Sequence, residues 1–332
     1  MQIIKKFQTR IIDEISTGLD KLATTYALWK AACQFPMIND IPDPFFMIGI
    51  PGSVHIMKLN ARYIPKEINL ILVLNGMDDW EEEKARSLLK PKGIIRIKND
   101  VLVPHGKVLD LLFRNLQRPF GILDYDCFVF NTNYFSKITE LGPSVMLNSL
   151  FSKDSPVFGK TPHTFFCFFQ TEIIQYIMKK YKVNSEITSF SDRIPSKAQK
   201  QLLTVGITNN KYPETGKNYF DTLRLIVSLG FSEGFTCNCL DLNMLNQQST
   251  LDAFHVGGVA DPNSTYGWWA VRGSYFWWRA LETCDDLNIV REYYKRYGNR
   301  KSSQIFDGFP EYLNLTKKPF FDTVEKIVGK AS

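Results

Sequence analysis

The amino-acid sequence predicts an α/β protein built on a mostly parallel sheet with helices on both faces. Strand-like and helix-like segments alternate between residues 68 and 130, and the strand-like segments are apolar throughout instead of at every second position. Such strands are typical of a parallel sheet that is covered on both sides. Polar residues mark three strand ends, at Asn75, Asn99-Asp100 and Asp124–Asp126. Ligands of parallel sheets bind beyond the carboxyl ends of the strands, so these residues point to one crevice.

The first element is a predicted helix. We expect its apolar stripe to pack on the rest of the protein, with a membrane-surface or dimer helix as the alternative. Basic residues Lys5, Lys6 and Arg10 lie near its beginning, and the region from Pro36 to Pro51, with four prolines, is predicted to be irregular. The stripe recurs in steps of three and four at Ile4, Phe7, Ile11, Ile15, Leu19, Leu22, Tyr26 and Trp29.

The alternating elements follow in order. Ile68–Leu74 is a predicted strand, and Met77–Leu89 is a predicted helix whose first turn carries acids that suit the helix dipole. Gly93–Ile97 is the second strand, Lys107–Leu116 the second helix and Phe120–Phe130 the third strand. Later segments comprise a strand at Thr164–Phe169, a helix at Glu172–Tyr181, a polar loop with some helix at 184–213, a helix at Asp221–Leu229 capped by Asp221, and an aromatic, partly helical region at 266–294.

Composition limits the classes of function. The 332 residues are 44% apolar and 22% charged, which excludes a disordered tail or a fibrous repeat. Aromatic residues reach 14%, so the core can be large and rich in rings. The net charge of +6 is scattered, and no basic stripe indicates a specific nucleic-acid partner. This charge fits phosphorylated small ligands and an anionic membrane surface equally well.

The sequence also indicates where the protein works. No apolar run of about twenty residues predicts a transmembrane helix, and Arg10, Asp13 and Glu14 interrupt any signal-peptide core. The six cysteines lack the spacing of a disulfide framework, and Cys237-Asn238-Cys239 has no second pair that would indicate zinc. We therefore expect a cytoplasmic protein, with peripheral contact at the inner membrane face and a homo-oligomer left open.

Asp124-Tyr125-Asp126 is the strongest sign of chemistry. If these residues continue the third strand, both carboxylates point to the same side. Two unpaired anions inside an apolar run would be costly, and a divalent cation relieves that cost. Oxygen ligands favour Mg²⁺ or Mn²⁺ over zinc. The alternative is a strand end with two solvated acids.

Two further motifs support the acids. His255-Val256-Gly257-Gly258 places an imidazole, a third candidate metal ligand, beside glycines that let the backbone approach a ligand closely. Alone, such a histidine is more often an ordinary hydrogen-bonded polar group. Asp221, followed by Leu223-Arg224, is either a simple helix cap or a general base that deprotonates an acceptor hydroxyl.

Taken in order, these motifs resemble the GT-A glycosyltransferases, most closely the inverting family-2-type enzymes. The resemblance covers residues 68 to 258. The matching features are a first strand ending in Asn75, the His105-Gly106 turn before a helix, Leu123-Asp124-Tyr125-Asp126, the Asp221–Arg224 segment and His255–Gly258. The family's base motif is Glu-Asp, and Phe220 stands here in place of the glutamate.

The resemblance implies a Rossmann-like GT-A fold and a role for each motif. Asp124 and Asp126 would hold the metal with the diphosphate and ribose of the donor, and His255 would join as a metal ligand. Asn75, Asp100 and His105 would contact the nucleotide, and Asp221 would be the base. The implied domains are an N-terminal helix with a Pro-rich lead-in (1–64), the catalytic domain (65–262) and an aromatic, mainly helical C-terminal extension (263–332).

The implied reaction is sugar transfer from a nucleotide-diphosphate sugar, with a UDP-sugar expected, to a hydroxyl of a glycan or glycoconjugate. Mn²⁺ or Mg²⁺ would neutralise the departing diphosphate while Asp221 accepts the proton of the attacking hydroxyl. One base without a carboxylate nucleophile predicts inversion. Retention would result if no base acts and His255 serves the diphosphate.

Two other functions compete with this interpretation. A nucleotidyltransferase would share the sheet and the metal acids, but its first strand usually leads into a basic glycine-rich loop, whereas the loop here is Asn75-Gly76-Met77-Asp78-Asp79. A non-catalytic carbohydrate-binding protein would use the rings of Tyr266–Trp269 and Tyr275–Trp278. We expect these rings to form a dense core or a subunit interface rather than a sugar platform.

Overall fold

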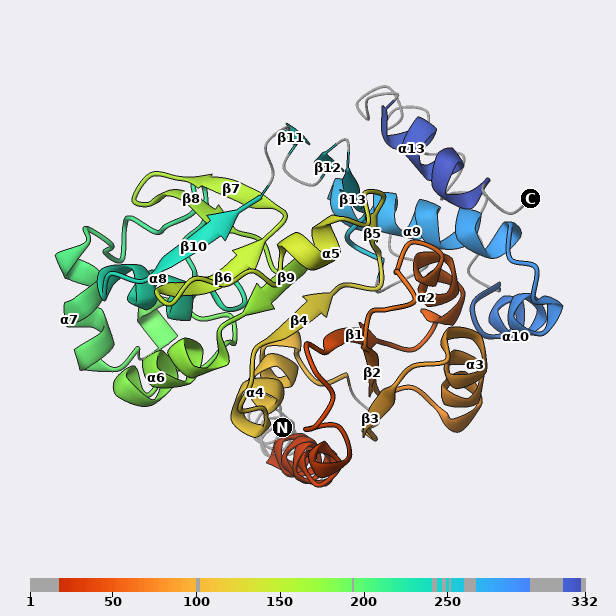
Figure 1. Ribbon diagram of the computed structural model, residues 1–332, viewed down its shortest axis with the longest axis horizontal. Helices are drawn as coiled ribbons and strands as arrows, with labels where there is room; N and C mark the ends of the chain where they lie inside the picture. The colour runs from red at the N-terminus through yellow and green to blue at the C-terminus, as the bar shows by residue number, and fades with distance from the viewer. Residues whose placement is uncertain are drawn as a thin grey trace, which may run out of the picture.

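A seven-stranded sheet forms the centre of the molecule, with the strand order β10-β6-β9-β4-β1-β2-β3 (Figure 1). Every neighbouring pair is parallel except the two pairs that involve β9. The predicted mostly parallel α/β sheet is therefore confirmed. The strands are β1 (Phe45–Gly49), β2 (Leu70–Asn75), β3 (Gly93–Ile97), β4 (Phe120–Leu123), β6 (Val145–Ser149), β9 (Phe166–Phe169) and β10 (Thr236–Cys239).

This computed structural model describes residues 18–99, 102–192, 194–240, 244–246, 249–250, 252–259, 267–298 and 319–329. Two smaller sheets accompany the central one in these ranges. One has the order β11-β12-β13-β5 and the other is the β7-β8 hairpin. Their strands are β5 (Cys127–Val129), β7 (Ser152–Ser155), β8 (Gly159–Pro162), β11 (Met244–Asn246), β12 (Ser249–Thr250) and β13 (Ala253–His255).

Helices cover both faces of the central sheet. Alternate residues of β1 enter two different apolar layers, because Phe46 and Ile48 pack with α4, α6 and α8, whereas Phe45 and Met47 pack with α2, α9 and α10. The helices are residues 18–32, η1 (Phe35–Met37), α2 (Val54–Ala61), α3 (Asp79–Leu89), α4 (His105–Asn115), α5 (Tyr134–Lys137), α6 (Thr171–Tyr181), η2 (Phe190–Asp192), α7 (Ser196–Thr204), α8 (Arg224–Ser232), α9 (Gly267–Glu282), α10 (Leu287–Tyr297) and α13 (Pro319–Val328).

The lead-in region differs from its prediction. The segment Pro36–Pro51 was expected to be irregular, but it contains β1, which lies between β2 and β4 in the middle of the sheet. Pro44 and Pro51 flank the strand instead of interrupting it, so none of the strand's own residues lacks an N–H. The prolines therefore mark the ends of a short buried strand.

The third predicted strand is also different. Phe120–Phe130 forms two strands that belong to different sheets, β4 and β5, and residues 124–126 form the turn between them. The prediction that both aspartates lie on one face of a strand is wrong. A buried acid (Asp126) and a half-buried one (Asp124) are placed more readily in a turn, where backbone N–H groups are free to approach them.

The N-terminal helix packs through a face other than the predicted one. Ala27 and Ala31 are buried against the sheet layer that contains α4, whereas Leu19, Leu22, Tyr26 and Trp29 are exposed by 56% or more. Small side chains allow the helix to lie close to its neighbours, and the larger apolar residues point away. The first half of the predicted stripe, Ile4 to Ile15, lies outside the described residues.

The aromatic C-terminal region contributes core. Phe276, Trp277 and Trp278 of α9 are at most 1% exposed, and the Trp277 indole N–H donates to the Gly52 carbonyl at 2.9 Å. The expected dense core is therefore present for these rings. Tyr266 and the side chains of Trp268 and Trp269 lie outside the described residues. Within the described part of the chain, no helix combines the length and the apolarity needed to cross a membrane.

Candidate active site

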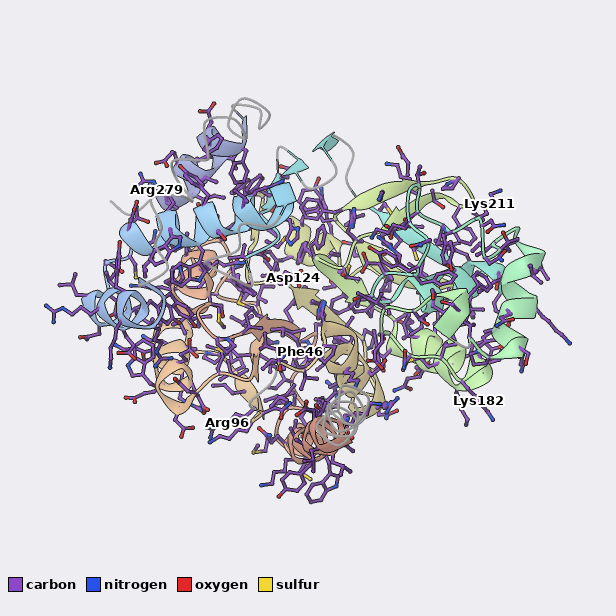
Figure 2. All side chains as sticks on the ribbon, turned by 180° about the vertical axis from the view of Figure 1, so that it is seen from behind. Phe46, Arg96, Asp124, Lys182, Lys211 and Arg279 are labelled. Carbon is purple, nitrogen blue, oxygen red and sulfur yellow. The ribbon has the colours of Figure 1, made fainter. Side chains whose placement is uncertain are left out.

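Three side chains from distant parts of the sequence converge where β4 ends. Asp124, Asp126 and His255 each present one ligand atom, and these atoms all lie within 4.8 Å of one another. The His255 Nε2 atom lies 3.4 Å from Asp126 Oδ1 and 3.7 Å from Asp124 Oδ2. Figure 2 shows Asp124 near the middle of the molecule, beside the tip of β4. The sequence prediction that these three residues share a site is consistent with this geometry.

Backbone hydrogen bonds shape the turn that carries the aspartates. The Asp124 N–H donates to the Phe165 carbonyl at 2.8 Å, and the Cys127 N–H donates to the Asp124 carbonyl at 2.9 Å. The buried Asn60 amide of α2 donates to the carbonyls of Asp124 and Tyr125, at 3.1 Å and 2.9 Å, and also to that of Cys127. The two N–H groups of one asparagine are thus shared among three carbonyls, which holds the turn in place.

The His255 strand meets this turn through β13 and β5, which pair antiparallel with His255 opposite Cys127. The Gly257 N–H donates to Asp126 Oδ2 at 3.0 Å. Gly257 and Gly258 have φ values of +71° and +68°, a conformation that glycine adopts without strain. Any Cβ on Gly273 of α9 would collide with the Gly258 backbone. The glycines predicted to approach a ligand therefore also let the backbone bond Asp126 and pack against α9.

The two carboxyl groups differ in acidity. Burial and the charge of Asp126 raise the pKa of Asp124 well above its usual value. Burial also acts to raise the pKa of Asp126, but the charge and hydrogen bond of His255 and the Gly257 N–H outweigh it, so this pKa is lowered. Without a cation, the pair favours one charge rather than two. A bound divalent cation would let both carboxylates ionise.

A stack of rings holds the imidazole of His255, and no sequence pattern indicates this stack. Phe165 lies between two histidines, with ring-centroid distances of 3.5 Å to His255 and 4.7 Å to His163, and the rings are within 17° of parallel. On α9, buried Arg272 donates to the His255 carbonyl at 3.0 Å, and burial lowers the pKa of Arg272 to about 10. Side chains from β8–β9 and α9 therefore fix the third candidate ligand.

Buried charges lie behind this stack. Arg224 forms an ion pair with Glu214 and donates a hydrogen bond to the Pro162 carbonyl. Its guanidinium also lies 3.5 Å from His163 Nδ1. Lys217 joins Glu214 at 2.9 Å. Burial acts to raise the pKa of Glu214, but Arg224 and Lys217 outweigh it and lower the pKa to about 2. The acid-Leu-Arg motif thus supplies a structural arginine.

Asp221 does not cap α8, contrary to the prediction. Leu223, with φ +67°, occupies the N-cap position, and α8 begins at Arg224. The Asp221 carboxylate pairs with Lys217 and accepts the Thr222 N–H at 2.9 Å, and its side chain is 40% exposed. The apolar periodicity does not show that the chain turns at Leu223 and that the helix starts only after it.

His105, the first residue of α4, is influenced by the negative charges of both Asp221 and Asp126. Burial lowers the pKa of His105 to about 4, and the negative charges of Asp221 and Asp126 act in the opposite direction. Its imidazole is therefore within electrostatic reach of both carboxylates. The buried Nε2 atom has no hydrogen-bond partner among the described residues, so a bound molecule can use it.

The two predicted base contacts differ. Asn75 is buried, donates from its amide nitrogen to the Val103 carbonyl at 2.8 Å, and accepts the Val103 N–H at 3.1 Å. These bonds join β2 to the segment before α4, and a role in nucleotide binding stays a prediction. Asp100 lies outside the described residues, so its predicted role stays a prediction too.

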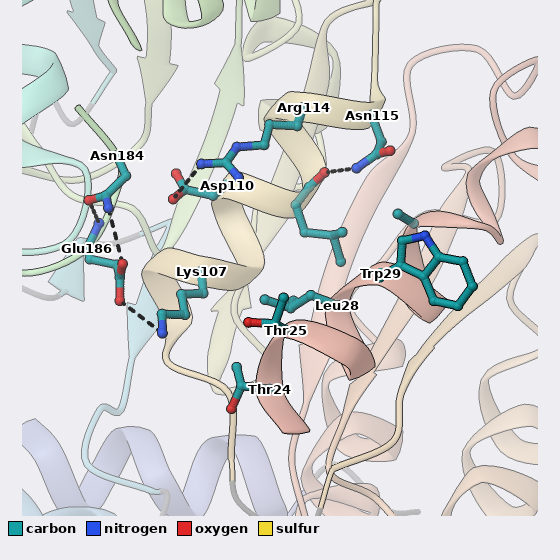
Figure 3. Close-up of a pocket in the computed structure, with 12 residues that line it drawn as sticks. Thr24, Thr25, Leu28, Trp29, Lys107, Asp110, Arg114, Asn115, Asn184 and Glu186 are labelled. Carbon is teal, nitrogen blue, oxygen red and sulfur yellow. Dashed lines mark hydrogen bonds and ion pairs between the residues drawn. The ribbon is translucent and has the colours of Figure 1, made fainter. Parts of the chain in front are cut away.

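A separate cavity of about 370 Å³ lies between the 18–32 helix and α4 (Figure 3). Lys107 and Glu186 approach to 3.8 Å across it, and Arg114 approaches Asp110 to 3.9 Å. Asp124, Asp126 and His255 are not among the residues that line it. The cavity therefore borders α4 without containing the three converging side chains.

Comparison with known proteins relates part of the chain to sugar transferases. Residues 31–174 match the StrH glycosyltransferase N-terminal domain. A dTDP-dihydrostreptose–streptidine-6-phosphate dihydrostreptosyltransferase of Streptomyces griseus is 29% identical over 106 residues, which are 32% of this chain and 27% of that protein. The chain thus matches about a quarter of the length of this relative. The matched domain includes Asp124 and Asp126 but ends before Asp221 and His255.

Solved structures give more distant similarities. The glycosyltransferase GlyE of Streptococcus pneumoniae is 13% identical, with a TM-score of 0.41 over 76% of this chain and 63% of that one. A cytidylyltransferase of Leptospira borgpetersenii is 10% identical, with a TM-score of 0.28 over 41% of this chain and 63% of that one.

Proposed function

We propose that this protein is a metal-dependent glycosyltransferase that moves a sugar from a nucleotide-diphosphate sugar to a hydroxyl acceptor. The observation that carries the proposal is the convergence of Asp124, Asp126 and His255 at the carboxyl end of a mostly parallel sheet. The match of residues 31–174 to a glycosyltransferase domain supports the reaction class. The acids lie within that matched segment.

The three side chains fit a divalent cation. Two carboxylates and an imidazole within 4.8 Å supply oxygen and nitrogen ligands suited to Mn²⁺ or Mg²⁺. The raised pKa of Asp124 supports this, because a cation would stabilise the ionised pair that burial disfavours. When bound, the metal would neutralise charge on the departing diphosphate. Asp124, Asp126 and His255 would hold it.

The remaining residues act on the donor and the acceptor. His105 offers its Nε2 atom to the bound donor, since this buried atom has no described partner. Asp221, which lies within electrostatic reach of His105, accepts the proton of the attacking hydroxyl. The bond from acceptor oxygen to anomeric carbon forms as the bond to the diphosphate breaks, through an oxocarbenium-like transition state. This displacement inverts the anomeric carbon.

Retention of configuration is the second candidate, and one observation favours it. The Asp221 carboxylate is paired with Lys217, so proton abstraction requires that this ion pair open. If the pair stays closed, no side chain at this position takes the proton. The configuration of the product, read by NMR coupling at the anomeric proton, distinguishes the two outcomes: inversion supports Asp221 as base, and retention removes it from that role.

For the donor we propose a UDP-sugar, with a dTDP-sugar as the comparison that the Streptomyces relative suggests by its name. For the acceptor we propose a hydroxyl of a glycan or glycoconjugate. We also propose that the protein works in the cytoplasm with peripheral contact at the inner membrane face. No disulfide with a described residue is formed by Cys33, Cys127, Cys167, Cys237 or Cys284, which supports a reducing compartment.

The test is nucleotide release from UDP- and dTDP-sugars, with and without Mn²⁺. We expect metal-dependent release with wild-type protein and a loss of at least about a hundredfold in Asp126→Asn, because oriented charge at a transition state contributes on that scale. Glu140→Asn, an exposed acid away from the site, is the matched control and keeps the wild-type rate. The proposal would be refuted if the rate of nucleotide release were the same with and without Mn²⁺ and the same in wild type and Asp126→Asn.

A further inference from the structure

The N-terminal helix exposes the side of itself that the sequence predicts to be buried. Within residues 18–32, the described apolar stripe consists of Leu19, Leu22, Tyr26 and Trp29, which are 61%, 68%, 56% and 61% exposed. On the opposite face, Ala27 and Ala31 are 3% and 0% exposed and belong to the apolar core. The helix is thus already anchored through its small residues, and its larger apolar residues are mostly exposed, with Trp29 also bordering the cavity beside α4.

The stripe has the composition of a surface that lies in a lipid interface. Tyr26 and Trp29 stack with ring centroids 6.0 Å apart, and such amphipathic rings favour the boundary between headgroups and acyl chains. The two leucines extend the apolar surface along the same face. In the sequence, the three- and four-residue spacing continues back to Ile4, with Lys5, Lys6 and Arg10 interspersed.

Charge distinguishes a lipid surface from a second copy of the chain. Successive helical residues differ by about 100°, so Lys21 and Lys30 project on opposite flanks of the stripe. Both are exposed, and the Lys30 ammonium lies 4.6 Å from the centre of the Tyr26 ring. Helices that pair through an apolar seam usually carry complementary charges along its edges. Two cationic flanks instead complement anionic lipid headgroups.

We propose that the face formed by Leu19, Leu22, Tyr26 and Trp29, hereafter the lipid-facing stripe, docks the protein on an anionic membrane surface. The helix would lie in the plane of the interface, with its apolar residues inserted and its lysines at the level of the phosphates. The packed alanines hold the body of the protein against the helix from the other side. This inference specifies the surface and the lipid class for the proposed peripheral localisation, and it is independent of sugar transfer.

The test is sedimentation of the 332-residue protein with phosphatidylglycerol-rich vesicles and, in parallel, with pure phosphatidylcholine vesicles, with no sugar donor present. We expect binding to the anionic vesicles that weakens with added salt. The double variant Leu22→Glu with Trp29→Glu should bind at least about tenfold more weakly, because two apolar side chains that would enter the lipid interface are replaced by charges. Neutralising the flanks with Lys21→Gln and Lys30→Gln should weaken the preference for anionic lipid.

Leu203→Glu is the matched control, because Leu203 is 56% exposed on α7, outside the stripe, and its replacement should leave vesicle binding unchanged. Thermal unfolding confirms that each variant is folded, as expected for exposed positions. Equal binding by wild type and the double variant would overturn the proposal. A second result would also overturn it: wild type does not bind vesicles but forms a dimer in sedimentation equilibrium, and the double variant does not form that dimer. This result would assign the stripe to contact with a second copy of the chain.

Discussion

At the scale of single residues, the candidate site depends on charges that are buried together. Glu214 and Arg224 are 4% and 5% exposed, and they form an ion pair behind the ring stack of His163, Phe165 and His255. A buried ion pair of this kind adds little net stability to the folded state. Removing one partner is nevertheless strongly destabilising, because the remaining charge stays buried without a countercharge. The pair therefore controls stability next to the site.

We predict that Glu214→Gln lowers the free energy of unfolding by about 3 kcal/mol at pH 7, because Arg224 remains buried without a countercharge. The folded-state pKa of Glu214 is depressed to about 2 from its ordinary value of 4.5. Its contribution is therefore complete above pH 4.5 and lost as the pH falls toward 2. Urea unfolding of wild type and variant should give curves that converge over that interval, with exposed Glu140→Gln as a neutral control. A difference between the two proteins that grows as the pH falls would contradict this assignment.

The ring stack gives a second prediction. Phe165→Leu removes the surface on which the His255 imidazole lies at 3.5 Å, while the backbone bond from Asp124 to the Phe165 carbonyl can remain. We expect Mn²⁺ affinity to fall by at least about tenfold, the scale of effects from groups that orient metal ligands. Phe158→Leu, which removes a ring that packs at a tilt on Phe231 instead, should bind Mn²⁺ like wild type. Equal affinities in all three proteins would show that the stack does not orient His255.

Individual side chains were predictable from sequence only where the residue type itself carries the chemistry. Asp124, Asp126 and His255 stand out because acids and an imidazole interrupt apolar segments. Phe165 and Arg272 gave no such signal, because a phenylalanine in a ring-rich chain and an arginine in a helix are ordinary. Phe165 contacts the His255 ring, 90 residues further along the chain, and Arg272 of α9 donates to the His255 carbonyl, 17 residues back. Periodicity does not report contacts of this range.

At the scale of elements, buried strands and a helix that begins with acidic residues were predictable. The sequence Gly93–Ile97 forms β3 with the predicted bounds, and α3 begins after Asp78, whose carboxylate accepts the Glu81 N–H at 2.8 Å. β1 was missed because the prolines on both sides of this five-residue strand predict irregular structure. The break between β4 and β5 was missed because residues 120–130 are apolar on both sides of the acids. The local sequence pattern indicates that a strand is present, but the strands with which it pairs determine where it ends.

The centre of the sheet provides an element-scale prediction. Gly121 of β4 lies beside β1, and a Cβ at this position would collide with the Phe45 ring. Gly121→Ala should therefore lower the free energy of unfolding by about 1–3 kcal/mol through overpacking. Urea unfolding measures the change. Gly298→Ala, where a Cβ meets atoms no nearer than 3.5 Å at a φ of −66°, should be close to neutral. Equal stability of the two variants would mean that β1 and β4 separate more easily than their packing indicates.

At the scale of the whole molecule, the candidate site is assembled from both halves of the chain. Asp124 and Asp126 lie in the segment that matches a glycosyltransferase domain, and His255 arrives on β13 from beyond that segment. The sheet class follows from the order of strands and helices along the sequence. His255 reaches the acids by a different route, because β13 pairs antiparallel with β5 in the smaller sheet. The orientation of the N-terminal helix does not follow from the sequence, because helix periodicity identifies a stripe without showing which face meets the core.

The most direct test of the account is calorimetric titration of Mn²⁺ into the protein, alone and with UDP, for wild type and for Asp126→Asn. If Asp124, Asp126 and His255 form the metal site, wild type binds a single ion per chain, UDP tightens that binding, and the variant loses it while remaining folded. Binding of the same strength in wild type and variant, or none in wild type at any nucleotide concentration, would contradict the account.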